Sequence, residues 1–365
     1  MNTTGDKPSQ RPPQPDATAS LSDSELHLVS TTFGIGDVTQ WQAITRGVGK
    51  ADKFALRAAT QDYLLKRRRW PTDAAASQQG LDRAAFRHAL RRHLHQAGMP
   101  VEPYLTCSTR PASILLHSGR SYEVMRFVHG TEFARSTESC RDAGTRLSQM
   151  HEALSTFPYS TAAPISTCHD QDTLERRVQA LQHRLTQSKQ DAAYLLQLLD
   201  TVGTRYRAAA AHVDAQEYGK WPPILIHGDW HPGNLIFRDH RVVSILDFES
   251  AGRAPRAIDI ACGALHFSIQ AHGDDPQQWP DEPDELRWFA FCAGYDAFNP
   301  DHVLSRAEVR ALPWLMIEAL ITEAVGALSA TGKVGVVSAR HMLEILVGKV
   351  GWLEKNAPRM IRVLE

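Results

Sequence analysis

The segment ILIHGDWHPGNLIFRDHRVVSILDFE, which runs from Ile224 to Glu249, decides how the rest of the chain is interpreted. Short apolar runs flank a loop that holds His, Asp, His and Asn, and a further apolar run ends in Asp-Phe-Glu. Apolar runs bounded by Gly, Pro and Asn predict short strands joined by tight loops. The polar groups of such a loop need partners. A metal ion that carries a phosphate is one suitable partner.

The polar residues of this segment follow a known spacing. His227, Asp229 and Asn234 fill H-x-D-x-x-x-x-N, the spacing of a protein-kinase catalytic loop. Asp-Phe-Glu at 247–249 follows where kinases carry Asp-Phe-Gly. The form HGDWHPGN followed by ILDFE, with Asp259 in PRAIDIA, resembles the aminoglycoside phosphotransferase and choline kinase family.

The resemblance covers about residues 25–350 and implies the fold. We expect an α+β protein with the bilobal, protein-kinase-like fold, in which a small antiparallel β N-lobe precedes a large α-rich C-lobe. The expected divisions are a disordered tail over 1–20, an N-terminal nucleotide-binding lobe over 21–130, and a C-terminal catalytic and substrate-binding lobe over 131–365. The tail sequence is polar and proline-rich, which is typical of disorder.

Length and composition agree with two lobes. The 365 residues exceed the usual size of a single core. Forty basic and 41 acidic residues nearly balance, which argues against a nucleic-acid-binding protein. Five scattered cysteines without a C-x-x-C pair favour a reduced, cytoplasmic setting. The sequence contains no run of about 18 apolar residues, so we expect no segment that spans a membrane. The oligomeric state is left open.

The periodicity of the chain predicts its main elements. The pattern S-x-x-E at 22–25 indicates the start of a short helix. WQAITRG, KFALRAA, QDYLLKRR, SILLHS and SYEVMRFV have strand character, and Leu81–Ala97 has helical character. Further helices are expected over Ser136–Leu154, over one long stretch Gln171–Val213, and through most of the chain after Ile258.

The resemblance implies a kinase that uses ATP and Mg²⁺ and transfers the γ-phosphate to a hydroxyl of a small molecule. Asp229 would be the catalytic base, because a carboxylate can take the proton of the acceptor hydroxyl. Asn234 and Asp247 would be Mg²⁺ ligands, since Mg²⁺ prefers oxygen donors. Asx residues in loops often only cap turns. Three of them at this spacing, followed by Asp-Phe-Glu, favour the functional interpretation.

Three further residues have roles implied by the resemblance. His227 would hold the loop through hydrogen bonds, and His231 would line the acceptor or phosphate side. These histidines are four residues apart, but no third ligand suggests a zinc site. Asp259 would brace the backbone of the catalytic loop from the following helix. Glu249 replaces the kinase glycine, and its role is left open between metal support and capping.

Nucleotide contacts are expected from the first lobe. Lys66 would reach the α- and β-phosphates, although it begins a run of four basic residues and such runs are usually solvated. Strand alternation favours the functional role, because it places Lys66 with Leu64 on one face of the strand. Gly47 and Gly49 would let the backbone approach the phosphates.

The segment VMRFVHG resembles the hinge of the family. The Arg126 carbonyl and the Val128 amide would bond the adenine edge, and Met125 would lie at the back of the base. Only main-chain contacts are expected of the first two residues.

One departure from the kinase pattern concerns the partner of Lys66. Kinases pair this lysine with a glutamate on the next helix, but position 87 is arginine, and Asp82 is the only acid in the 81–97 segment. We therefore expect that no carboxylate of this helix pairs with Lys66, which would face Asp247 or solvent in the unliganded chain. A catalytically inactive kinase-fold binding protein remains an alternative.

The acceptor is the least determined feature. Eleven residues separate Asp247 from Asp259, too few for the activation segment of a protein kinase. GDDPQQWPDEPDE, at 273–285, carries six acids in thirteen residues. Such a segment could attract a polycationic aminoglycoside or another amine, or could be a solvated loop. Homoserine-like, choline-like and sugar acceptors all remain open.

Overall fold

The chain folds as two compact units. The first consists of Met1–Ala84 and Pro103–Phe127, and the second consists of Ala85–Glu102 and Val128–Glu365. The computed structural model describes residues 20–44, 51–59, 61–158, 165, 167–187, 191–271, 275–300 and 303–365. The expected boundary near 130 lies close to Phe127, whereas residues 85–102 group with the second unit. Of the expected disordered tail, residues 1–19 lie outside the described residues.

The first unit contains a five-stranded antiparallel sheet in the order β1-β2-β3-β5-β4. Its elements are α1 (Asp23–Phe33), β1 (Val38–Ile44), β2 (Ala51–Ala58), β3 (Asp62–Arg69), β4 (Leu115–His117) and β5 (Arg120–Arg126). The five predicted strands are all present. The β1–β2 turn that contains Gly47 and Gly49 lies outside the described residues.

Residue alternation gives this sheet one apolar face. Phe54, Leu65 and Val124 are directly opposite one another on β2, β3 and β5, and all three are fully buried. Helix α1 contributes Val29 and Phe33 to the same core cluster. Lys66 therefore projects from the other face, as the alternation predicted.

Glu25, in the first turn of α1, joins this helix to the sheet. Its carboxylate forms the predicted capping box with Ser22 and accepts hydrogen bonds from Arg67, Arg120 and the Tyr122 hydroxyl at 2.8–3.0 Å. Burial alone would raise the pKa of Glu25. The hydrogen bonds from Tyr122, Ser22 and Arg67 outweigh it and lower the pKa from 4.5 to about 2.

Replacement of Glu25 by glutamine is expected to lower the free energy of unfolding by about 1–3 kcal/mol at neutral pH. Because the folded pKa lies below the ordinary value, the contribution is present above pH 4.5 and is lost as the pH falls towards about 2. Denaturant unfolding across this range, with Asp23→Asn as the control in the same turn, checks the effect. Equal destabilisation by both variants would contradict it.

The second unit is mainly helical. Its helices are the later part of α2 (Ala74–Gln96), with α3 (Thr137–Leu154), α4 (Gln171–Thr186), α5 (Ala192–Asp214), α6 (Ala257–Ser268), α7 (Glu285–Phe298), α8 (Arg306–Thr331) and α9 (Ala339–Leu364). Its short strands are β6 (Pro223–Ile226), β7 (Leu235–Arg238), β8 (Arg241–Ile245), β9 (Gly252–Pro255), β10 (Lys333–Val334) and β11 (Val337–Ser338). Strand β6 pairs with β9, and β7 pairs with β8, both antiparallel.

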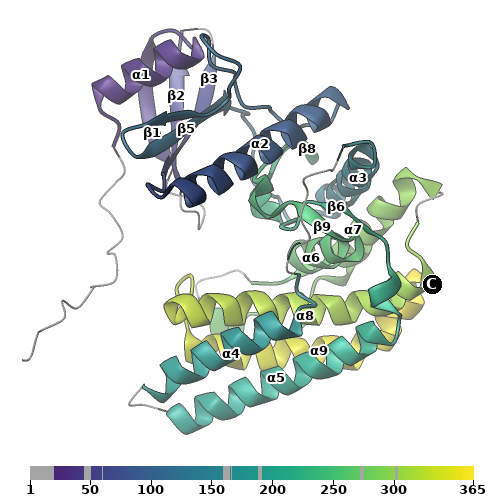
Figure 1. Ribbon diagram of the computed structural model, residues 1–365. Helices are drawn as coiled ribbons and strands as arrows, with labels where there is room; N and C mark the ends of the chain where they lie inside the picture. Colours follow the sequence, from purple (N-terminus) through teal and green to yellow (C-terminus); the bar gives the residue numbers. More distant parts are fainter. Residues whose placement is uncertain are drawn as a thin grey trace, which may run out of the picture. The chain divides into compact units, whose positions relative to one another are not determined.

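The long helical stretch expected over Gln171–Val213 forms two helices, α4 and α5. Two helices pack against each other and against α8, which one straight helix of that length could not do. Figure 1 shows α4, α5, α8 and α9 side by side. One apolar side chain from each helix, Leu181 of α4 and Leu199 of α5, is fully buried in this packing.

Helix α8 is the one described helix that is long and apolar enough to cross a membrane. In its most apolar window, 72% of the residues are buried, and it contacts α4, α5, α6 and α9. A core helix shows the same properties.

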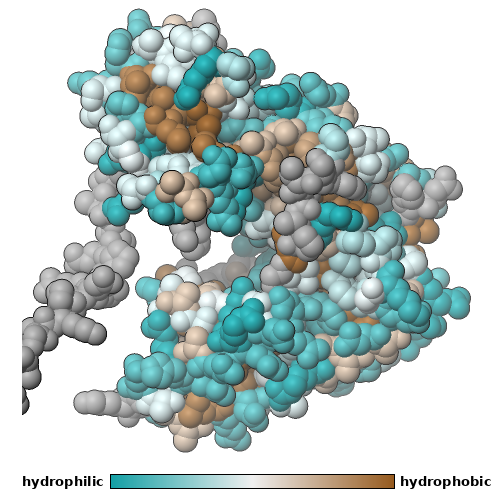
Figure 2. All heavy atoms as spheres, viewed as in Figure 1, coloured by the Kyte–Doolittle hydropathy of each residue, from teal (hydrophilic) through white to brown (hydrophobic). Residues whose placement is uncertain are grey.

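In Figure 2 most of the visible surface is hydrophilic, and an apolar patch lies over the strands of the first unit.

Candidate active site

The HGDWHPGN segment forms the loop between β6 and β7 in the second unit. Gly228 has φ +76°, and a Cβ there would lie 2.3 Å from the Ser250 carbonyl oxygen, so the position requires glycine. Pro232 opens a 3-10 turn that ends at Asn234. The loop is thus shaped by its own glycine and proline and by the chain that follows Asp247.

Asp259, on α6, binds the backbone of this loop. Its two carboxylate oxygens accept hydrogen bonds from the amides of His227 and Gly228, at 2.7 and 2.8 Å. The brace expected from the sequence is therefore present. His151 Nε2 lies 3.0 Å from the same carboxylate, and His151 Nδ1 lies 2.9 Å from the Tyr295 hydroxyl. The brace is buried and is held by three helices.

Asp229 lies between Asn234 and His231. Asn234 Nδ2 donates to an Asp229 carboxylate oxygen at 2.9 Å, and His231 Nε2 lies 3.6 Å from the other oxygen. Burial raises the pKa of Asp229, but the hydrogen bonds and charges of His231, His227 and Asn234 outweigh it, so the pKa lies below its usual value. Asp229 is therefore ionised at neutral pH and can accept a proton.

His227 links the catalytic loop to the segment before Asp247. Its side chain is fully buried, and burial lowers its pKa, so the imidazole is neutral at pH 7. Nε2 donates to the Leu246 carbonyl at 2.8 Å. The Leu246 amide in turn donates to the Asn234 carbonyl at 2.8 Å. These bonds hold Asn234 and Asp247 at the same end of the β7–β8 hairpin.

Two arginines of α2, one helical turn apart, hold the residues that follow Asp247. Arg87 lies 3.1 Å from the Glu249 carboxylate, and the Arg91 guanidinium lies 5.3 Å from the Phe248 ring centre. Arg91 also donates to the Glu102 carbonyl. Asp247 itself has φ +53°, a strained backbone for a residue with a side chain. The arginines therefore fix a segment whose conformation is costly by itself.

Comparison with known proteins identifies the family. The sequence profile of the phosphotransferase enzyme family matches residues 41–300. The chain belongs to this family. It is a small-molecule phosphotransferase, and the resemblance that the HGDWHPGN segment predicted is confirmed.

Relatives of this phosphotransferase cover most of its length. A homoserine kinase of Phenylobacterium zucineum is 26% identical over 302 residues, which are 81% of each chain. A homoserine kinase of Gluconacetobacter diazotrophicus is 27% identical over 81% of this chain and 82% of its own.

Solved structures share the fold of the phosphotransferase. An aminoglycoside phosphotransferase of Alicyclobacillus acidocaldarius is 18% identical, with a TM-score of 0.63 over 95% of this chain and 96% of its own. Spectinomycin phosphotransferase, in complex with ADP and spectinomycin, is 14% identical, with a TM-score of 0.62 over 93% and 99%. The predicted α+β, kinase-like fold class is confirmed.

In the first unit of the phosphotransferase, Lys66 is 4% exposed, so the expectation that it could face solvent is wrong. Lys66 stands directly opposite Glu123 of β5, which is fully buried and forms an ion pair with Arg68. Directly opposed side chains share one face of a sheet. The partner of the Lys66 ammonium group stays a prediction.

The expected hinge residues differ in burial. Met125 is buried, stands opposite Leu64 on the face that carries Lys66, and forms a β-bridge with Tyr104. The Arg126 side chain is exposed, and Val128 is half-buried. The expected contacts of residues 126 and 128 involve only main-chain atoms, so they do not require either side chain to be buried. The adenine contacts themselves stay predictions, as do those of Gly47 and Gly49.

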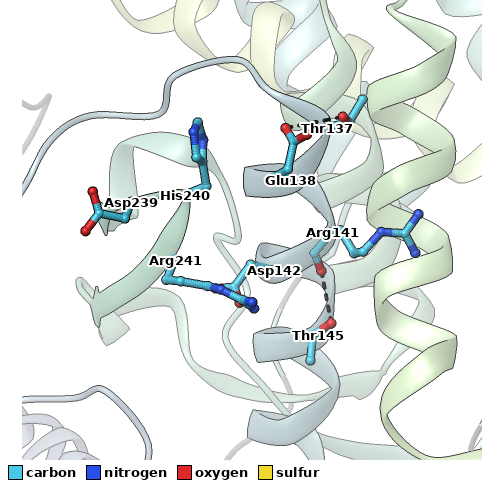
Figure 3. A pocket seen from close by; sticks show the side chains of 8 residues that line it. All are labelled: Thr137, Glu138, Arg141, Asp142, Thr145, Asp239, His240 and Arg241. Carbon is cyan, nitrogen blue, oxygen red and sulfur yellow. Dashed lines mark hydrogen bonds and ion pairs between the residues drawn. The ribbon is translucent and has the colours of Figure 1, made fainter.

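A cavity of about 520 Å³ lies at the opposite end of the β7–β8 hairpin from Asn234 and Asp247. Figure 3 shows the hairpin turn beside α3, with the Arg241 side chain pointing towards Asp142 of α3 and the Asp239 side chain pointing away. Arg241 donates to Asp142, and His240 lies 2.9 Å from the Ser136 hydroxyl. These contacts join the hairpin to α3, and the cavity contains none of the predicted catalytic or metal-binding residues of the phosphotransferase.

Replacement of Arg87 by alanine is expected to weaken the apparent Mg²⁺ affinity and the turnover of the phosphotransferase by about tenfold or more. Residues that do not bind the metal but hold its ligands in position usually have effects of this size. Glu249→Gln should give a similar loss, because it removes the same ion pair. Turnover measured against Mg²⁺ concentration, with the exposed Arg92→Ala as control, provides the test. Wild-type Mg²⁺ dependence in both variants would contradict the role.

Sequence reasoning missed several of these residues. His151 and Arg91 are polar side chains on the buried faces of their helices, and that was the signal available. Tyr295 and the pairing of Arg87 with Glu249 left no local pattern, because their partners are distant in sequence.

Proposed function

We propose that this phosphotransferase transfers the γ-phosphate of ATP to the hydroxyl of a short amino acid alcohol such as homoserine. The observation that carries the phosphotransfer chemistry is the ionised Asp229 on a loop fixed by Asp259. The choice of acceptor is supported by the homoserine kinases that match 81% of the chain.

Asp229 would act as the general base. A hydroxyl placed beside the carboxylate oxygen on the His231 side could give its proton to Asp229 as the hydroxyl oxygen bonds to the γ-phosphorus and the bond from that phosphorus to ADP breaks. General-base catalysis of this kind typically contributes about 10²- to 10⁴-fold in rate. Asn234 holds the other oxygen of the carboxylate, so the base has a fixed direction. The rest of the catalytic effect in phosphoryl transfer comes from positioning and charge stabilisation.

Asn234 and Asp247 fit a magnesium site. The side chain of Asn234 has an amide oxygen that its bonds to Asp229, which use Nδ2, leave available. Within the described residues no cluster of three or more His, Cys, Asp or Glu could hold a metal. A site with an amide and a carboxylate oxygen, completed by phosphate oxygens, is what Mg²⁺ uses with nucleotides. Mg²⁺ bound there would neutralise charge on the phosphates.

The acidic segment 273–285 gives little support to a polycationic acceptor. Three of its described acids have structural partners: Asp275 caps a 3-10 turn, Asp284 caps α7, and Glu285 pairs with Arg359. Lys349, on α9, donates to the carbonyls of Gln270 and Pro280 on either side of the turn. The segment is therefore tied to α7 and α9, as expected for a structural connection.

A panel of acceptors, assayed for ADP release and for phosphorylated product, tests the proposal. It should contain homoserine, aminopropanol, choline, sugars and aminoglycosides. Homoserine is expected to give the highest kcat/KM. If no hydroxyl compound is phosphorylated although ATP·Mg²⁺ binds, the inactive binding protein would be the better account.

A further inference from the structure

A line of partly exposed polar side chains begins at Asp229 and leads away from the catalytic loop. His231 Nε2 lies 3.6 Å from the Asp229 carboxylate, and the His231 ring centre lies 5.7 Å from that of His266. His266, in the last turn of α6, lies 3.0 Å from the carboxylate of Glu323 on α8. These contacts place an imidazole–carboxylate pair one side chain beyond Asp229 in the same unit.

We propose that His266 and Glu323 form a recognition site for a zwitterionic acceptor, in which Glu323 binds the ammonium group and His266 binds the carboxylate. The inference rests on the proposed function, because it assumes an acceptor hydroxyl at Asp229. It goes further in naming the two groups that would distinguish an amino acid alcohol from a simple amine or a sugar.

The environment favours a positive charge on His266. Burial alone lowers its pKa, but the charge and hydrogen bond of Glu323 and the charge of Asp229 outweigh burial, so the pKa is raised. The carbonyl end of α6 also stabilises a cation at this position. A cationic imidazole can attract an acceptor carboxylate that the acidic groups of the site would otherwise repel.

Exposure leaves both members of the pair open to a ligand. Glu323 is 49% exposed and His266 is 26% exposed, and Asp229 is 48% exposed at the other end of the line. A second His–Glu pair among the described residues of this unit, His169 with Glu318, is 8% and 0% exposed. That buried pair can only hold α8 to the chain before α4, whereas the His266–Glu323 pair can exchange part of its contacts for an acceptor.

The alternative acceptors differ in the charged groups that they carry. An acceptor with an ammonium group alone would gain from Glu323 but not from His266. A sugar would gain from neither. A zwitterion meets an opposite charge at each member of the pair, so the pair adds to both affinity and orientation of the hydroxyl. The charge pattern therefore favours a short zwitterion over a polycation.

The test compares homoserine with two acceptors that each lack one of its charged groups: γ-hydroxybutyrate, which lacks the ammonium group, and 3-amino-1-propanol, which lacks the carboxylate. Wild type should prefer homoserine to both in kcat/KM. Glu323→Gln should reduce the preference over γ-hydroxybutyrate by about tenfold to hundredfold and largely keep the preference over aminopropanol. His266→Gln should have the reverse effect. Glu323→Asp, which keeps the charge, should retain most of the discrimination.

Controls separate this inference from the proposed function and from folding. Glu344→Gln, on α9, removes an exposed ion pair with Arg340 and should leave all ratios unchanged. ATP·Mg²⁺ binding shows whether each variant is folded. If the variants lose activity equally with all three acceptors, the pair only holds α6 to α8 and the inference is overturned, while the function stands. If wild type phosphorylates only sugars or aminoglycosides, the inference and the choice of acceptor both fail.

Discussion

Asp229→Asn is expected to lower kcat by about 10²-fold or more while ATP·Mg²⁺ still binds with nearly wild-type affinity. Asparagine has the shape of aspartate and can keep contact with Asn234 after an amide rotation, but it cannot accept the proton of the acceptor hydroxyl. The loop itself should persist, because Asp259 holds it through the amides of His227 and Gly228.

Steady-state kinetics and calorimetry with a non-hydrolysable ATP analogue measure the two quantities separately. Asp239→Asn is a suitable control, because it makes the same change in the β7–β8 turn, where φ is +48° and asparagine is well tolerated. Unchanged turnover in Asp229→Asn would remove this residue from the role of base. Lost nucleotide binding would indicate a structural role instead.

Asp247→Ala is expected to reduce turnover by about 10²- to 10³-fold and to weaken the apparent affinity for Mg²⁺. Asp247 would supply one of few protein oxygens to the metal, and phosphate oxygens cannot replace it. In wild type, a chelator should abolish activity, and Mg²⁺ or Mn²⁺ should restore it.

Turnover is measured over a range of Mg²⁺ concentrations for wild type, Asp247→Ala and Glu282→Gln. The last variant removes an exposed acid from the acidic segment and is expected to behave as wild type. Activity that persists in the chelator, or that requires zinc, would contradict the assignment of Asn234 and Asp247 as magnesium ligands.

The sequence allowed the catalytic loop to be predicted well, because its determinants are local. The fixed spacing of Asp229 and Asn234 and the glycine at 228 define the loop within eight residues. Asp259 follows on the next helix, so its bonds to the loop could be expected from the resemblance. The alternation of β3 likewise placed Lys66 on the face opposite the apolar core.

Features that depend on distant packing could not be predicted. The helix expected from Leu81 begins at Ala74 instead, because Asp73 accepts a bond from the Ala76 amide at the helix start. Gly80, within this helix, gives room to the Trp70 ring, which would lie 2.9 Å from a Cβ. The contact between Arg87 and Glu249 joins residues 162 positions apart and depends on the tertiary fold alone.

Phosphorus NMR of a reaction that contains ATP, Mg²⁺ and homoserine tests the central claim most directly. The account predicts a new phosphomonoester signal, coupled to the methylene protons of the acceptor, that grows in equal amount with ADP and is nearly absent with Asp229→Asn. Formation of ADP with inorganic phosphate alone, or product formation that does not depend on Asp229, would contradict the claim that this residue directs phosphoryl transfer to an acceptor hydroxyl.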